Sequence, residues 1–104
     1  MRVAIALCAA LTLTACSASQ MMRSEVDYTF TSTKSADALE ECISLAMSSL
    51  STPQTIRGEG RRTLTFGHHP ITVAAITIIE GQPNTVEVRG DLHENWDRRI
   101  TGCA

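Results

Sequence analysis

The three histidines, His68, His69 and His93, are the side chains in this chain most suited to binding a metal ion. Neutral imidazole is a good ligand for zinc and for copper. His68 and His69 are adjacent, however, so in a strand they would point to opposite faces. They also lie between Gly67 and Pro70, where solvated turn residues are common. We therefore expect no metal site and no cofactor.

Nucleophilic catalysis would need a serine or cysteine beside an oriented base. The chain has many serines, but none lies in a G-x-S-x-G or S-x-x-K pattern. The paired carboxylates Glu40 and Glu41 are neighbours on a predicted helix, so their side chains diverge, as on a solvated face. We predict that the protein is not an enzyme.

Two arginine pairs, Arg61-Arg62 and Arg98-Arg99, are the basic clusters of the chain. Arginine binds phosphate groups in a bidentate manner, so these pairs are candidates for contact with lipid A phosphates or another anionic envelope component. Acidic residues stand close to both pairs in the sequence, which favours ordinary surface charge. We leave an anion-binding role open.

The N-terminus has the architecture of an export signal. Arg2 carries the one positive charge, and residues 3–13 are apolar except for Thr12. Polar residues from Ser17 to Arg23 end this run well short of the about 20 apolar residues that a spanning helix needs. The pattern predicts a cleaved signal peptide rather than a transmembrane segment.

The signal ends in Leu13-Thr14-Ala15-Cys16, which resembles the signal motif of bacterial lipoproteins: an aliphatic residue, a small or hydroxyl residue, Ala or Gly, and Cys. The resemblance implies cleavage after Ala15, a diacylglyceryl group on the Cys16 sulfur and an acyl chain such as palmitate on its new amino group. Several acyl chains hold a protein on a membrane for practical purposes permanently. Ser17, rather than Asp, after the cysteine implies the outer membrane, with the periplasmic face favoured.

The same resemblance assigns the four cysteines. Cys8 leaves with the signal and Cys16 carries lipid, so Cys42 and Cys103 remain to form one disulfide in an oxidising periplasm. Two buried free thiols are the alternative. A redox-active pair is not expected, since neither cysteine belongs to a C-x-x-C motif.

Processing divides the chain into a signal peptide (1–15), a lipidated tether (16–25) and one domain (26–104). Without the signal, eight basic and eleven acidic residues remain, a formal net charge of −3. This balance does not suggest a nucleic-acid partner. A domain of this size is close to the lower limit for a single core, so a disulfide could decide whether it folds.

Sequence periodicity predicts a strand over 26–31, where Tyr28 and Phe30 share one face. A helix should begin after Ser35 as N-cap. Its apolar stripe follows helical spacing and has Cys42 on its border. The stripe consists of Ala36, Leu39, Ile43, Ala46, Met47 and Leu50.

From residue 54 the period changes to two. Segments 54–57 and 62–66 flank Gly58-Glu59-Gly60-Arg61, which fits either a hairpin turn or a glycine bulge within one bent strand. Residues 71–79 are apolar on both parities, as in a central strand covered on both faces or a strand with a bulge. A further strand over 85–89 should direct Val86 and Val88 into the core.

Asp91 and Glu94 have the spacing of a capping box, followed by a stripe of Leu92, Trp96, Ile100 and Cys103. The prediction is a two-layer α+β domain of order β-α-β-β-β-α, with both helices on one face of a mainly antiparallel sheet of three or four strands. If both helices cover the same face, Cys103 meets the first helix.

The order of these elements resembles small uncharacterised proteobacterial and phage lipoproteins, whose activity is not defined. We expect a membrane-anchored envelope protein with a non-enzymatic, structural or protein-contact role and a protein partner. An inhibitor or binder of a soluble periplasmic or host factor is one alternative, and a metal or small-ligand carrier is another.

Overall fold

The computed structural model describes residues 18–68 and 70–104. Their elements, in chain order, are α2 (Ala18–Arg23), β1 (Tyr28–Ser32), α3 (Ala36–Ala46), β2 (Gln54–Gly58), β3 (Arg61–Phe66), β4 (Ala74–Ile79), β5 (Asn84–Arg89) and α4 (Glu94–Thr101). The predicted α+β class is confirmed. The sheet has five strands rather than three or four, because the Gly58–Arg61 segment is a hairpin turn with Gly60 in the left-handed region (φ 71°).

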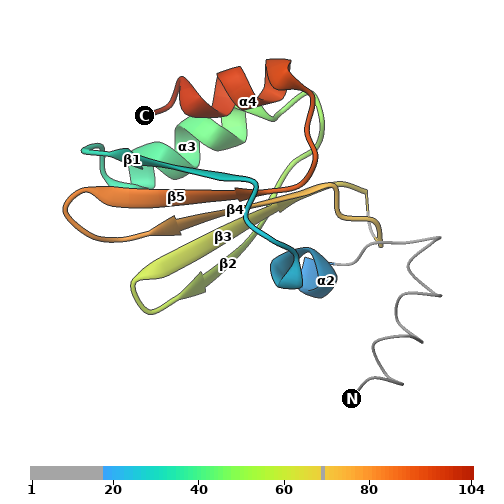
Figure 1. Ribbon diagram of the computed structural model, residues 1–104, viewed down its shortest axis with the longest axis horizontal. Helices are drawn as coiled ribbons and strands as arrows, with labels where there is room; N and C mark the ends of the chain where they lie inside the picture. The colour runs from blue at the N-terminus through green and yellow to red at the C-terminus, as the bar shows by residue number, and fades with distance from the viewer. Residues whose placement is uncertain (1–17, 69) are drawn as a thin grey trace.

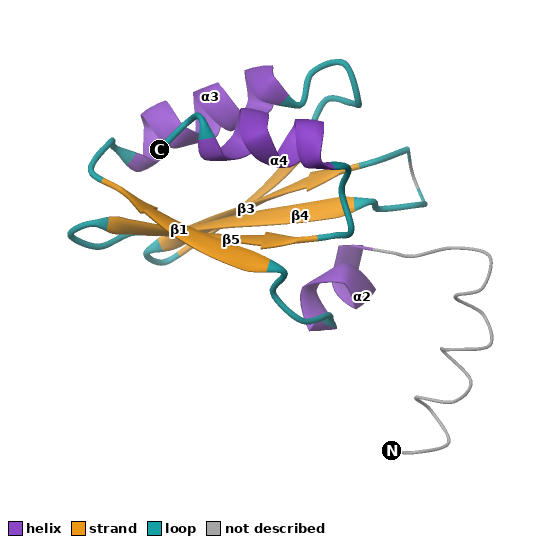
Figure 2. Ribbon diagram, turned by 45° about the horizontal axis from the view of Figure 1, so that its top comes forward, coloured by secondary structure: helices purple, strands orange, loops and turns teal. Residues whose placement is uncertain are grey.

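The five strands form one sheet of order β1-β5-β4-β3-β2, and every neighbouring pair is antiparallel. α3 and α4 lie side by side over one face of the sheet, and α2 lies against the other face near one end (Figures 1 and 2). The prediction that both main helices share one face is therefore confirmed.

The core lies between this helix pair and the sheet. The stripe of α3 is buried at Ala36, Leu39, Ile43 and Met47, and α4 contributes Ile100. The sheet contributes alternate residues of β3, β4 and β5, including Val86 and Val88 as predicted. These alternate positions face one side because side chains in a strand have a period of two.

β4 is the central strand, and it is shorter than the predicted 71–79. Ala74, Ile76 and Ile78 face α3 and α4, whereas Ala75 is buried on the face that α2 contacts. Burial on both sides explains why apolar residues occur at both parities of this strand, on the second beside the buried Thr77. Ile71 and Val73, which the sequence placed in the strand, precede it and are exposed.

Two capping predictions had different outcomes. Ser35 caps α3 as expected, its hydroxyl accepting a hydrogen bond from the Ala38 N–H at 3.1 Å. The Asp91 cap was wrong: α4 begins later, and His93 is its N-cap, with Nδ1 accepting from the Asn95 N–H at 3.2 Å. The Leu92 N–H donates to the Gly90 carbonyl at 2.9 Å, which makes a tight turn at Asp91, and Leu92 packs on the core before the helix begins.

Candidate functional site

Cys16, the predicted lipidation site, lies outside the described residues, as do the other residues of the predicted signal. The part of the chain nearest to it is α2, which falls within the segment interpreted as a tether. Met21 of this helix is only 8% exposed, and the helix contacts β4. The Arg89 side chain also donates from Nε to the Ser24 carbonyl at 3.2 Å. Residues 18–24 are thus docked on the domain.

The predicted disulfide between Cys42 and Cys103 is present. Cys42 lies on α3 and Cys103 directly after α4, with their Cα atoms 5.8 Å apart, in the ordinary range for a disulfide. Cys103 is fully buried. The bond links the two helices of the layer at the place where their apolar stripes meet.

The histidines are not brought together as a metal site in the described structure. His68 is exposed in a turn, His93 uses Nδ1 to cap α4, and His69 lies outside the described residues. Within residues 18–68 and 70–104, no three His, Cys, Asp or Glu residues are grouped so that they could hold a metal ion.

Arg62 is the centre of an ion-pair cluster between the sheet and α3. Its side chain is 12% exposed, and Nη1 lies 2.6 Å from Asp37 Oδ1 and 3.1 Å from Glu40 Oε1. Nη2 lies 3.3 Å from Glu80, and Arg57 binds the other Glu40 oxygen at 2.9 Å. The hydrogen bond from Arg62 and the positive charge of Arg62 lower the pKa of the Asp37 carboxyl below its usual value. The guanidinium of Arg62 is thus occupied by carboxylates.

The other candidate arginines are more exposed. Arg98 pairs with Glu94 at 3.2 Å along α4, and the Arg99 guanidinium lies over the Trp96 ring, 5.0 Å from its centroid. Such a contact is a cation–π interaction. Arg61 is exposed at the start of β3. The two arginine pairs belong to different elements, β3 and α4.

Tyr28 connects the edge strand β1 to α4. Its hydroxyl donates to Asp97 Oδ1 at 2.9 Å. Burial of the phenol raises its pKa above the usual value, and the hydrogen bond to Asp97, with the negative charges of Asp97 and Asp27, adds to the rise. The neutral phenol is therefore the form that the folded domain stabilises.

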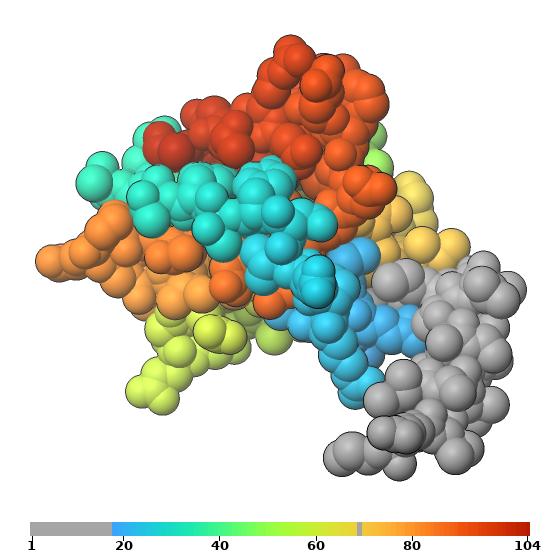
Figure 3. All heavy atoms as spheres, viewed as in Figure 1, coloured from blue at the N-terminus to red at the C-terminus, as the bar shows by residue number. Residues whose placement is uncertain are grey.

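Residues Gln54–Gly58 form the β2 edge of the sheet; sequence reasoning predicted a strand segment over 54–57 but not its position at the edge. All five residues are exposed, and Ile56 at the centre is 60% exposed. In Figure 3 the β2–β3 hairpin, in yellow-green, protrudes from the lower edge of the molecule. The turn at Gly58–Arg61 was the feature of the sequence that could have revealed this edge. A bulge within one strand fitted the same residues, so the choice stayed open.

The backbone groups of β2 alternate between the sheet and the outside. Glu80 N–H donates to the Gly60 carbonyl at 2.8 Å, so Gly60 and every second residue after it bond to β4. The intervening residues of β3 bond to β2, where their partners are Gln54, Ile56 and Gly58. The N–H and C=O groups of Thr55 and Arg57 therefore point away from the sheet.

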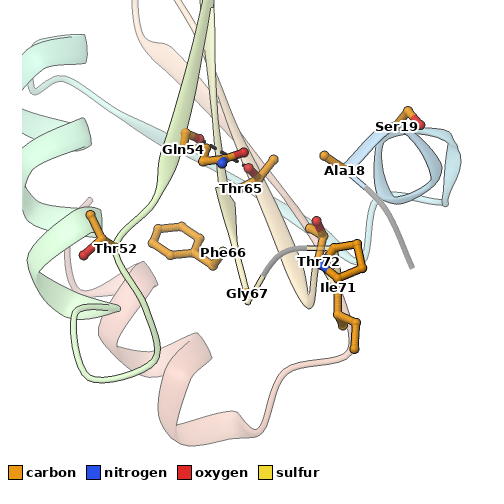
Figure 4. Close-up of a pocket in the computed structure, with 10 residues that line it drawn as sticks. Ala18, Ser19, Thr52, Gln54, Thr65, Phe66, Gly67, Ile71 and Thr72 are labelled. Carbon is orange, nitrogen blue, oxygen red and sulfur yellow. Dashed lines mark hydrogen bonds between the residues drawn. The ribbon is translucent and has the colours of Figure 1, made fainter. Parts of the chain in front are cut away.

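A shallow hollow of about 360 Å³ separates α2 from the end of the sheet. Ala18 and Ser19 line one side, and Phe66, Gln54 and Thr52 line the other (Figure 4). Pro70 and Ile71 also contribute, and none of the described residues that line it is charged. Sequence reasoning did not find this hollow, because it depends on the docking of α2.

Comparisons of the chain with known protein families, with characterised proteins and with solved structures found no match. Of the helices that the structure describes, none combines the length and the apolar character needed to cross a membrane. The molecule is thus a disulfide-linked α+β domain. The lipoprotein resemblance stays a prediction.

Proposed function

We propose that this chain is a lipoprotein of the bacterial cell envelope, anchored through Cys16 to the periplasmic face of the outer membrane. Its domain has a non-enzymatic role as an accessory subunit. It contacts a partner protein by accepting an extended segment of that partner along the β2 edge.

Two features support the envelope location. Residues 13–16 match the lipoprotein signal motif at the end of an apolar run. The Cys42–Cys103 disulfide suits a compartment that oxidises thiols, such as the periplasm.

The β2 edge is the observation that carries the contact role. An open edge strand offers unpaired backbone donors and acceptors to another strand, and natural proteins usually cover or blunt such edges. Here the outward groups of Thr55 and Arg57 flank the exposed Ile56 side chain. An added strand would gain backbone hydrogen bonds from the first two and an apolar contact from the third.

β1, at the other edge of the sheet, is less suited to this role. Tyr28 and Phe30 pack against the core, and Ser32 is buried. Tyr28 is also tied to α4 through Asp97. A partner strand at β1 would find fewer exposed side chains than at β2, where every residue is exposed.

Proline substitution tests this contact without disturbing the sheet. Thr55→Pro removes an outward N–H and leaves the β2–β3 hydrogen bonds in place, since proline is tolerated in edge strands where the missing N–H faces solvent. A photo-crosslinking residue at Ile56, in the lipidated protein in cells, should capture one envelope partner. Adding Thr55→Pro should abolish the crosslink.

Thr55→Val is the matched control, because it keeps the N–H and replaces only the hydroxyl with a methyl group; its crosslink should persist. If Thr55→Pro does not fold, as judged by circular dichroism, Arg57→Pro tests the other outward N–H. A crosslink that is unchanged in a folded proline variant contradicts the edge-strand contact. A crosslink to a second copy of this chain identifies the added strand as the β2 strand of that copy.

The anchor has its own test. Cells fed a labelled fatty acid should label the protein, and Cys16→Ser should abolish the label and leave the precursor uncleaved. Normal processing of the Cys16→Ser protein would contradict the lipoprotein assignment.

A further inference from the structure

We propose that the domain rests directly on the bilayer, with the end that carries α2 and the Pro70–Val73 segment against the lipid headgroups. This inference rests on the proposed lipidation of Cys16 and adds an orientation to it. The partner surface is a phospholipid bilayer. The chain between the lipid on Cys16 and the docked helix is short enough to bring the domain into contact with that bilayer.

The first step is that α2 belongs to the domain and not to a free tether. Met21 is buried, the helix contacts β4, and Arg89 holds the Ser24 carbonyl just beyond its end. Ser24 also caps the last turn, its hydroxyl donating to the Met21 carbonyl at 2.6 Å. Ala18 therefore has a fixed place on the domain surface.

The second step is the reach of the chain. Only two residue steps separate Cys16 from Ala18, so their Cα atoms are at most about 7 Å apart. A free tether from Cys16 to Glu25 would instead reach about 30 Å. An acylated cysteine lies at the level of the headgroups, so the Ala18 end of the domain must lie there as well.

The third step is the chemistry of that end. Ala18 shares its hollow with Pro70 and Ile71, and Ile71 and Val73 are 45% and 37% exposed. We call Ala18, Pro70 and Ile71 the anchor-side patch. Apolar side chains are favourable at the boundary between headgroups and acyl chains.

The acidic residues near α2 lie toward its other end. Glu25, Asp27 and Asp91 line a separate hollow together with Met21 and Ser24. Met21 lies halfway along α2, so this acidic hollow begins about 4.5 Å along the helix axis from Ala18. Glu25 and Asp27 follow the end of α2 that is remote from Ala18.

This orientation leaves the β2–β3 turn free. In Figure 1 the turn lies at the end of the sheet opposite to α2. The bilayer would contact the end of the sheet where β2 begins at Gln54, and the rest of the β2 edge, toward the turn, would remain open to proteins in the aqueous phase.

The test uses the mature lipidated protein in vesicles of phosphatidylcholine and phosphatidylglycerol. Its native cysteines are acylated or in the disulfide, so one introduced cysteine can carry an environment-sensitive fluorophore. Ile71→Cys places the probe in the anchor-side patch, and Leu45→Cys, at a 67% exposed position on α3, is the matched control on the helix layer. The probe at 71 should be quenched several-fold more by quencher-labelled lipid than the probe at 45.

Flotation with the vesicles is measured first. A protein that does not float contradicts the lipid anchor itself, whereas a protein that floats with equal quenching at both positions overturns only the orientation. A flexible Gly/Ser linker inserted between Ser17 and Ala18 should keep flotation and reduce quenching at 71. Undiminished quenching with the linker would overturn the step based on chain length.

Discussion

Cys42 on α3 and Cys103 after α4 lie with their Cα atoms 5.8 Å apart and join the two helices that cover the sheet. Sixty-one positions separate them in the sequence. The bond closes most of the domain, including all strands except β1, into one loop. Its position explains how a domain of this size maintains a defined helix layer.

Removing this bond should strongly destabilise the domain. In the chain-entropy model, closing a loop of about 62 residues stabilises the folded state by up to about 4 kcal/mol. The Cys42→Ala/Cys103→Ala variant, compared with the wild type in urea unfolding, should lose a large part of that free energy. Thiol counting on the unfolded wild type without reductant should find neither cysteine free; two reactive thiols would contradict the bond.

Tyr28, the single tyrosine of the chain, should report on the contact with Asp97. Because folding raises its pKa, the stabilisation from the neutral phenol is complete below the ordinary value of 10.0 and is lost as the pH rises above it. Phenolate absorbance of the folded protein should appear only well above this pH. The urea-unfolded chain should titrate near the ordinary value.

Two variants separate the causes of this shift. Asp97→Asn keeps an oxygen acceptor and removes the charge, so the Tyr28 pKa should fall only part of the way, since burial is its largest cause. Tyr28→Phe removes the hydrogen bond and should cost about 1 to 2 kcal/mol of stability. A folded-state titration no different from that of the unfolded chain would contradict the buried contact.

Asp37 should make the stability depend on pH in acid. Its pKa is lowered by Arg62, so the folded state keeps this carboxylate charged to lower pH than the unfolded chain does. The stabilisation is present above the ordinary value of 3.8 and is lost as the pH falls below it. Asp37→Asn should therefore lower the free energy of unfolding at neutral pH. As the pH falls below 3.8, the stability of this variant should decrease less than that of the wild type.

Urea unfolding at a series of pH values measures both effects. Glu41→Gln is the matched control, because Glu41 is exposed on the same helix and lies outside the Arg62 cluster. Equal acid dependence in the Asp37→Asn variant and the wild type would show that the ion pair does not act in solution.

Gly90 should be hard to replace. Its φ of 117° is one that other residues rarely adopt, and a Cβ there would overlap the Val73 carbonyl oxygen and lie 2.9 Å from the Ala74 Cα. Gly90→Ala should cost more than about 2 kcal/mol. Gly60→Asn is the control, since its φ of 71° suits asparagine and nothing lies within 4 Å of the added Cβ. Thermal unfolding measures the stability of both variants. Equal stability of Gly90→Ala and Gly60→Asn would contradict this prediction.

Much of this fold follows from local sequence pattern. The Ser35 cap, the α3 stripe and the alternation in β5 are each set by residues close in the chain, and the structure confirms them. Cys103 also falls where the helical spacing of the last segment predicts it. These features agree because local preference and tertiary packing point the same way.

The rest depends on contacts distant in sequence. The docking of α2 requires the far face of β4, so six residues without clear periodicity form a helix there. The choice between a bulge and a hairpin at Gly58–Arg61 depends on the pairing of β3 with both neighbours. The Arg62 cluster joins β3 to Asp37 and Glu40 of α3 and to Glu80, which follows β4, and no local pattern predicts that meeting.

The mass of the protein extracted intact from membranes tests the central claim most directly. The account predicts a polypeptide that begins at Cys16, with a mass excess equal to a diacylglyceryl group plus any acyl chain on its amino group, and two fewer hydrogens for the disulfide. A polypeptide that retains residues 1–15, or one that begins at Cys16 or elsewhere without acyl groups, would contradict it.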